Sequence, residues 1–239
     1  VYGNPCDTSK INKIANQHDL KVIYDVAHAF GVKKDGESIL NEGNLSILSF
    51  HATKVFNTFE GGAIISQTAE MKKKIDDLKN FGFQDEITIE GIGVNGKMNE
   101  VQAAMGLLQL KYIDEVIKKR KQIVQSYRDK LLDIEGISFF THEENIEHNY
   151  SYFPIFINKD KFGKSRDKVY DELKSNNIYA RRYFYPLVSQ FKPYQKSPSA
   201  KTTNLPIAEE MSNQVICLPI YPSFKIEDVD RVVNIILCS

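Results

Sequence analysis

Two kinds of apolar pattern alternate along the first eighty residues. Short runs rich in β-branched and aromatic residues occupy positions 22–25, 45–50 and 62–66, and each has the length of a buried strand. In segments 7–19 and 68–82, apolar residues recur at helical spacing instead, which predicts helices. Strands that alternate with helices predict an α/β domain with a largely parallel sheet.

The pattern then changes to one long helical stretch, from about Asn99 to Leu132. Its apolar residues share one face of a helix: Ala103, Leu107, Leu110, Ile113 and Ile117. This length exceeds one layer of a small domain, so we expect the helix to carry the chain into a second lobe.

The remaining chain mixes shorter strands and helices. The predicted elements are strands within 137–140 and 152–157 and helices over 164–176 and 226–237. They indicate a smaller α+β lobe. We therefore expect residues 1–115 to be part of a large domain and residues 116–239 to be a small C-terminal domain.

Composition narrows the class of protein. Of the 239 residues, 42% are hydrophobic and 26% are charged, which is typical of a soluble globular protein. Lys plus Arg and Asp plus Glu are both 31, so the chain carries no excess charge for binding nucleic acid or an anionic membrane. No apolar run is long enough to span a bilayer. Three widely spaced cysteines favour reduced thiols and a cytoplasmic location, and their spacing predicts no metal site.

Four polar residues gather near the predicted strand ends. Asp25 ends the first strand, where α/β sheets bind ligands, although alone it would equally suit a helix cap or a solvated strand end. His28, Ser49 and Lys54 are each unremarkable alone. The sequence "SFHATK", however, sets a hydroxyl and an amine on one turn beyond a strand, and such a turn can hold a phosphate.

An amine near that phosphate can form an imine with a carbonyl on the same ligand, if its pKa is lowered. Asp25 could then pair with a ring nitrogen and keep it protonated. A lysine, an aspartate and a phosphate cup are what pyridoxal phosphate (PLP) requires of a protein. Lys54 is therefore the candidate Schiff-base lysine.

Several ordered motifs carry a family resemblance. The segments "VYGNPCD", "VIYDVAHAFG", "SFHATK", "EGGAI" and "GVNGKMNEVQAAMGLLQL" resemble the DegT/StrS-type sugar-nucleotide aminotransferases, over nearly the whole chain and most strongly from 21 to 110. These are PLP enzymes of fold type I, the aspartate-aminotransferase fold. The resemblance implies that residues 1–115 are part of the PLP-binding large domain and 116–239 the small lobe.

The resemblance also implies roles for matching residues. Asp25 would pair with the pyridinium nitrogen, and His28 would lie beside the ring. Ser49 would hold the phosphate, and Lys54 would bind the cofactor and move the proton between C4′ and the sugar carbon. Asn95, in "GVNGK", would reach the phosphate of the partner's cofactor across a homodimer.

The sequence departs from the family pattern in places. Lys97 stands where the family more often has arginine, and Asp-Val-Ala-His replaces the usual Asp-Ala-Ala-His. Family members have well over a hundred residues before "VYGNPCD", so we expect this chain to be the C-terminal two-thirds of such an enzyme. A related dehydratase branch has histidine in place of the lysine, and Lys54 argues against it.

The resemblance places "YARRYFYPL" (179–187) at the sugar nucleotide. Arg181 and Arg182 could clamp a diphosphate, although a solvated surface pair is an equal alternative, and Tyr183 and Tyr185 would be wall residues. The segment "RRYFYP" resembles that of members that aminate dTDP-4-keto-6-deoxyhexoses at C4, and glutamate is the family's usual amino donor. The resemblance therefore implies a role in the biosynthesis of deoxyaminosugars, such as those of O-antigens.

Two alternatives stay open. The chain could be a fragment that binds the cofactor poorly and turns nothing over, in which case exposed apolar surface and aggregation are expected. It could also be a regulatory or sensory member that holds the cofactor without using it. Dye binding to the exposed apolar surface, or poor solubility, would favour the fragment, and turnover of an amino donor would separate the regulatory member from the enzyme.

Overall fold

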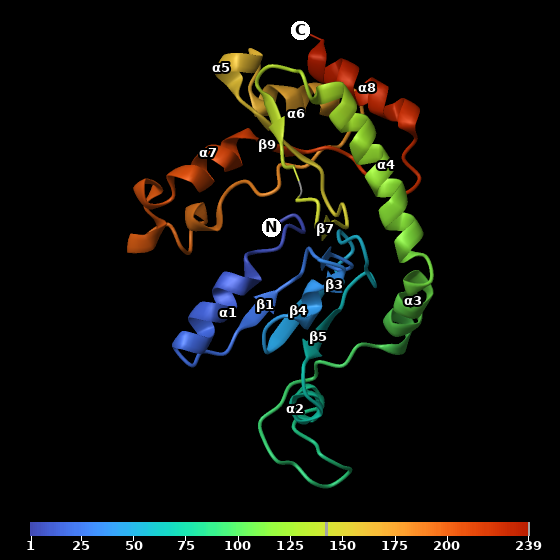
Figure 1. Ribbon diagram of the computed structural model, residues 1–239, viewed down its shortest axis with the longest axis vertical. Coiled ribbons are helices and arrows are strands. Elements are labelled where there is room, and N and C mark those ends of the chain that lie inside the picture. The colour runs from blue at the N-terminus through green and yellow to red at the C-terminus, as the bar shows by residue number, and fades with distance from the viewer. Residues whose placement is uncertain (142, 239) are drawn as a thin grey trace. The chain divides into compact units, whose positions relative to one another are not determined.

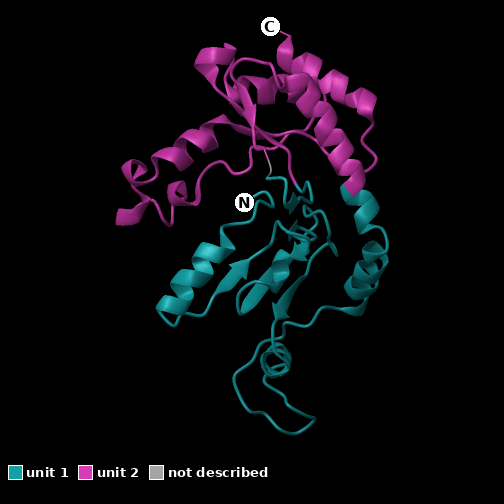
Figure 2. Ribbon diagram, in the orientation of Figure 1, with its two compact units in different colours: residues 1–117, 142–151 teal, residues 118–141, 152–239 magenta. Residues whose placement is uncertain are grey.

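The computed structural model describes residues 1–141 and 143–238. The chain forms two compact units, one of Val1–Ile117 with His142–Ser151 and the other of Lys118–Thr141 with Tyr152–Ser239 (Figure 2). The division expected from the sequence, between residues 115 and 116, did not include the return of the chain to the first unit.

A mixed three-stranded sheet forms the centre of the first unit (Figure 1). Its strands are β1 (Ile23–Asp25), β4 (Leu45–Ser49) and β5 (Gly62–Ser66), in the order β1-β4-β5. Strands β1 and β4 are parallel, whereas β4 and β5 are antiparallel. All three predicted strands are thus confirmed, but the parallel arrangement holds for only one of the two pairings.

The predicted helices of this unit are confirmed, with side-chain caps. Helix α1 (Thr8–Gln17) begins after Asp7, whose carboxylate accepts the Lys10 N–H at 3.0 Å. Helix α2 (Ala69–Lys79) begins after Thr68, whose hydroxyl plays the same role. Each cap satisfies one of the N–H groups that a helix start leaves without a backbone partner.

The single helix predicted from Asn99 to Leu132 is wrong. The structure has α3 (Glu100–Leu110) and α4 (Ile113–Leu131), separated by a tight turn. At this turn the N–H groups of Lys111 and Tyr112 bond to carbonyls three residues back, so the helix axis is interrupted without a proline or glycine.

A small antiparallel sheet was missed by the sequence analysis. It joins β2 (Lys33–Lys34), β3 (Glu37–Ser38) and β7 (Ile146–Glu147) in the order β3-β2-β7. The Asp-Gly turn between β2 and β3 has positive φ at both central residues, which is the usual signal for a tight hairpin. Two-residue strands are too short to give a period.

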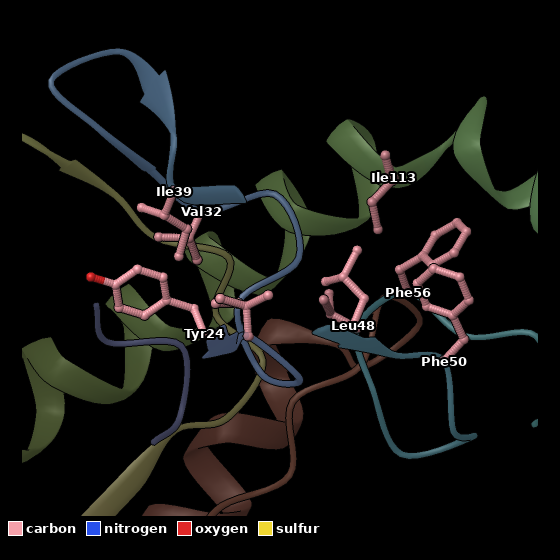
Figure 3. Close-up of a cluster of buried hydrophobic side chains, with 10 residues drawn as sticks. Tyr24, Val32, Ile39, Leu48, Phe50, Phe56 and Ile113 are labelled. Atoms are coloured by element: carbon pink, nitrogen blue, oxygen red, sulfur yellow. The ribbon is translucent and has the colours of Figure 1, made fainter. Parts of the chain in front are cut away.

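The core of the first unit lies on one face of the β1-β4-β5 sheet (Figure 3). Its buried residues are Tyr24, Val26, Ala29, Val32, Ile39, Leu48, Phe50, Val55, Phe56 and Ile113. On the other face, Ile23, Ile47 and Ile64 are 58%, 43% and 48% exposed. Within the described residues, the sheet is therefore buried on one side only.

The second unit has an antiparallel sheet of β6 (Ile137–Phe139), β8 (Pro154–Ile157) and β9 (Val215–Cys217), in the order β6-β8-β9. The predicted helices near 164–176 and 226–237 are present as α6 (Arg166–Ser175) and α8 (Ile226–Leu237). The sequence analysis did not find α5 (Lys159–Phe162), α7 (Pro206–Gln214) or β9. Short 3₁₀ turns lie at Ile39–Asn41, Val188–Gln190, Pro198–Ala200 and Thr202–Asn204.

Over residues 1–141 and 143–238, no helix is both long and apolar enough to cross a membrane. The same part of the chain contains no group of three or more His, Cys, Asp or Glu side chains that could bind a metal ion.

Candidate functional site

Two neighbouring strand ends carry the first polar residues of the site. Asp25 is the last residue of β1 and Ser49 the last of β4. Because the strands are parallel and Asp25 lies opposite Ile47, their carboxyl ends meet at one edge of the sheet. Alternate strand residues share a face, so Asp25, Ile47 and Ser49 lie on the same side. The Asp25 carboxylate also accepts the Ala27 N–H at 3.0 Å.

Lys54 lies on the turn that follows β4. Its N–H donates to the His51 carbonyl at 2.9 Å, and the next two residues, Val55 and Phe56, are buried in the core. The His51 N–H makes a long contact of 3.4 Å with the Ser49 hydroxyl. The buried apolar pair therefore anchors the turn that carries Lys54.

The glycine doublet after this turn has a steric cause. Gly62 lies opposite Ser49 in the β4–β5 ladder. A Cβ atom on Gly62 would come within 2.6 Å of the Leu48 carbonyl oxygen, so a side chain here would push β5 away from β4. The Phe50 N–H also donates to the Gly61 carbonyl at 2.8 Å. This close approach closes the loop that carries Lys54.

Charges and burial set the state of Lys54 and His28. Partial burial lowers the pKa of the Lys54 amine, and the Asp25 carboxylate opposes that shift. Burial lowers the pKa of His28 to about 4, with a further contribution from the Lys54 cation, while Asp25 acts in the opposite direction. The structure thus brings Asp25, His28 and Lys54 within electrostatic range of one another. At neutral pH the imidazole of His28 is uncharged.

Backbone contacts fix the orientation of His28. Its Nδ1 atom accepts the Tyr2 N–H at 3.2 Å, so the neutral ring carries its proton on Nε2. Its carbonyl accepts the Asn149 Nδ2 at 2.9 Å and the Ser151 hydroxyl at 3.1 Å. Asn149 also donates to the Phe30 carbonyl at 2.8 Å.

Tyr2, Asn149 and Ser151 were missed by the sequence analysis. Asn149 and Ser151 lie 121 and 123 residues from His28 in the chain, and no local pattern announces such a pairing. Tyr2 has a positive φ of 62°, and the neighbouring Gly3 is the one signal in the local sequence of this unusual backbone.

Asn95 lies in an exposed loop of the first unit, on a different segment from Asp25, His28 and Lys54. It forms an isolated backbone bridge with Asn80, at the end of α2. The neighbouring Lys97 donates to the Asn80 side-chain carbonyl at 2.8 Å and lies 4.5 Å from the centre of the Phe81 ring. The base of the loop is therefore fixed, and Lys97 contributes to it.

The three predicted substrate residues belong to the second unit. Arg181 forms a backbone bridge with Cys217, and its side chain is exposed. Arg182 donates to the Asp167 carboxylate at 2.7 Å. The Tyr183 ring stacks on Phe184, with 5.0 Å between ring centres. The segment is thus built of one exposed and one paired arginine followed by aromatic rings.

Known proteins resemble the whole of this chain. It matches the model of the DegT/DnrJ/EryC1/StrS aminotransferase family over residues 1–237. It is 49% identical over 235 residues to the dTDP-4-amino-4,6-dideoxy-D-glucose transaminase of Shigella dysenteriae, a match covering 98% of this chain and 63% of that protein. The Escherichia coli protein of the same name is 48% identical over 237 residues, covering 99% and 64%. The chain therefore spans just under two-thirds of the length of these relatives.

The fold also has a solved counterpart. The crystal structure of DesI in the presence of its TDP-sugar product superposes with a TM-score of 0.90 at 34% identity, covering 99% of this chain and 60% of DesI. The fold is accordingly an aminotransferase fold.

Proposed function

The chain belongs to the DegT/DnrJ/EryC1/StrS aminotransferase family, and from this premise we propose that the protein transfers an amino group to a nucleotide-linked keto sugar. The cofactor is PLP in fold type I, and glutamate is the amino donor. Similarity to two dTDP-4-amino-4,6-dideoxy-D-glucose transaminases supports a dTDP-4-keto-6-deoxyhexose as substrate. The observation that carries the proposal is the position of Lys54 beside Asp25 and His28 at the edge of the parallel strand pair.

The chemistry of these residues fits the cofactor. A lysine amine with a lowered pKa is the group that condenses with an aldehyde. Asp25 would hold the protonated ring nitrogen, and the Ser49 hydroxyl would donate to a phosphate oxygen. When bound, PLP serves as the sink for the electron pair released at the amino carbon.

The remaining roles fall to four side chains of this chain. The burial that lowers the pKa of Lys54 increases the fraction of free amine, so this side chain can take up and return a proton. His28 is neutral and carries its proton on Nε2, so it can donate a hydrogen bond to an oxygen beside the ring. In the second unit, Arg181 would contact the diphosphate and Tyr183 would line the sugar site.

We infer a homodimer, with Asn95 contributing to the partner's phosphate site. Two segments of the first unit support an interface. In the loop after α2, Ile87 is 89% and Ile92 is 96% exposed, and on α3, Val101 is 76% and Leu107 is 66% exposed. Apolar side chains exposed to this degree favour association with a second copy.

The experiment is PLP binding followed by chemical fixation. The protein is titrated with PLP, reduced with borohydride, digested, and the peptides are mapped by mass spectrometry. We expect the reduced cofactor on Lys54 and a new absorbance band that the Lys54→Ala variant lacks. The matched control is Lys74→Ala, because Lys74 is an exposed lysine on α2, and it should behave as the unchanged protein.

Turnover is then assayed with glutamate and a dTDP-4-keto-6-deoxyhexose. Labelling of Lys54 with conversion of both substrates supports the proposal. Labelling without consumption of any amino donor would instead support a regulatory role that holds the cofactor unused. If the label falls on other lysines, or equally on Lys54 and Lys74, the assignment of the site is refuted.

A further inference from the structure

A compact charged cluster joins the segment predicted to contact the nucleotide to helix α6. We call it the Arg166 cluster: Arg166, Asp167, Tyr170, Arg182 and Tyr185. All five residues belong to the second unit. Two cations, one carboxylate and two aromatic rings meet in it, although these residues are separated by up to nineteen positions in the chain.

Arg166 is the fixed member of the cluster. Its side chain is 1% exposed, and its Nη1 atom donates to the carbonyls of Ser212 and Val215, both at 3.0 Å. These carbonyls lie at the end of α7 and the start of β9. The guanidinium therefore ties α6 to two further elements, and it lies 4.5 Å from the centre of the Tyr185 ring.

Asp167 connects the two arginines. Its Oδ1 atom lies 2.8 Å from Nε of Arg166 and 2.7 Å from Nη1 of Arg182. The hydrogen bond between Asp167 and Arg182 raises the pKa of the Arg182 guanidinium. One carboxylate oxygen thus bridges a buried arginine to an arginine of the nucleotide segment.

Arg182 is further held by aromatic faces. Its guanidinium carbon lies 4.4 Å from the Tyr170 ring centre and 5.7 Å from that of Tyr185. Such contacts hold a guanidinium in place through its face. The Tyr185 N–H also donates to the Arg182 carbonyl at 2.7 Å, so the backbone of the segment turns around the same residue.

Arg181 differs from Arg182 in how its main chain is held and in the contacts of its side chain. Its backbone N–H and carbonyl pair with Cys217 at 3.1 and 2.7 Å, so its main chain is fixed by β9 without help from its side chain. Within residues 1–141 and 143–238, its guanidinium has no ion-pair or aromatic partner. It is the exposed arginine of the pair.

We propose that Arg182 is a positioning residue that, through Asp167 and Tyr185, holds the 181–185 segment on the Arg166 anchor, while Arg181 alone contacts the diphosphate. The diphosphate contact of Arg181 rests on the proposed function. The positioning role of Arg182 rests on the contacts within the Arg166 cluster.

The role of Asp167 distinguishes positioning from contact. If Arg182 bound the diphosphate, loss of the Asp167 charge would release a competing partner and leave binding unchanged or tighter. If Arg182 positions the segment, Asp167→Asn weakens binding as Arg182→Gln does, and the double variant is no weaker than either single one. Arg182→Lys also discriminates, because it keeps the charge but loses the planar fork.

The first arm of the test measures hydrogen–deuterium exchange of the peptide covering 181–187 in the full chain. We expect faster exchange in Asp167→Asn, Arg182→Gln and Arg182→Lys. Arg181→Gln should leave exchange unchanged. So should Asp171→Asn, the matched control for Asp167, because Asp171 is an exposed acid one turn further along α6.

The second arm measures the dissociation constant for dTDP by calorimetry. Asp167→Asn and Arg182→Gln should each raise it about five- to tenfold, as expected for one charge-assisted bond. Arg181→Gln should raise it by a similar factor that multiplies with either change. The PLP absorbance band of these variants should match that of the unchanged protein, because the cluster lies outside the first unit.

Unchanged exchange in both Asp167→Asn and Arg182→Gln overturns the proposal, as does weaker dTDP binding in Arg182→Gln with none in Asp167→Asn. If the unchanged protein does not bind dTDP, the proposed substrate falls, and exchange alone then decides whether Arg182 positions the segment.

Discussion

The strongest stability prediction concerns Phe56, two residues after Lys54. Its side chain is 3% exposed, its ring is stacked on Phe30 with 4.3 Å between centres, and it meets Phe50 edge-on at 4.9 Å. Figure 3 shows Phe56 beside Phe50 in the core. Replacing a buried phenylalanine by alanine costs about 3–5 kcal/mol, from lost burial and from the cavity left behind.

The variant Phe56→Leu isolates the ring contacts. Leucine keeps most of the buried apolar surface but loses two aromatic pairs, each worth about 0.5–1.5 kcal/mol. We therefore expect about 2 kcal/mol for Phe56→Leu and about 4 kcal/mol for Phe56→Ala. Because Phe59 is 57% exposed, Phe59→Ala is the matched control and should change stability by about 0.5 kcal/mol or less.

The assay is equilibrium unfolding in urea, followed by circular dichroism. With a slope of about 2 kcal/mol per molar urea, Phe56→Ala should lower the midpoint by about 2 M and Phe56→Leu by about 1 M. Hydrogen exchange of the β4 amides identifies the transition of the first unit if the two units unfold separately. Equal midpoints for Phe56→Ala and Phe59→Ala would refute the assignment of Phe56 to the core.

Three further predictions test the surroundings of the site. In the folded protein the pKa of His28 is about 4, below the ordinary value of 6.5, so between these pH values the unfolded chain binds more protons and the free energy of unfolding should fall as the pH drops from 6.5 to 4. After allowance for solvent screening of a half-buried ring, the loss is about 1–2 kcal/mol, and the pH profile of His28→Asn should lack it. Gly62→Ala should cost about 1–3 kcal/mol because its Cβ would meet the Leu48 carbonyl, whereas Gly91→Ala, with open space around it, should not; equal melting temperatures would contradict this. Asn149→Ala should cost about 2–3 kcal/mol by removing the donor to two carbonyls, and a loss no larger than that of the exposed Asn145→Ala would count against it.

The sequence predicted those parts of the fold that local patterns specify. Helices α1 and α2 followed from apolar spacing, and strands β1 and β4 followed from short β-rich runs. The break between α3 and α4 could not be foreseen, because Lys111 and Tyr112 are ordinary helix residues. Three-dimensional packing decided it: Ile113 is buried, while Leu107 and Leu110 are 66% and 49% exposed.

The candidate site divides in the same way. The grouping of Asp25 and Lys54 depends on two parallel strands whose pattern is visible in the sequence. The support of His28 by Asn149 depends on a contact between residues 121 positions apart, which a single sequence does not reveal. The pairing of Arg182 with Asp167 was likewise invisible, because nothing in "ARRY" distinguishes one arginine from the other.

The return of residues 143–151 to the first unit has a consequence for biosynthesis. Strand β7 pairs with β2, and the His28 carbonyl accepts hydrogen bonds from Asn149 and Ser151. A ribosome adding about 5–20 residues per second needs about 6–24 s between making His28 and making those donors. The nascent first unit must therefore wait until part of the second unit has been made. Translation stopped at residue 117 would release a segment that contains Lys54 and His28 but lacks Asn149 and Ser151.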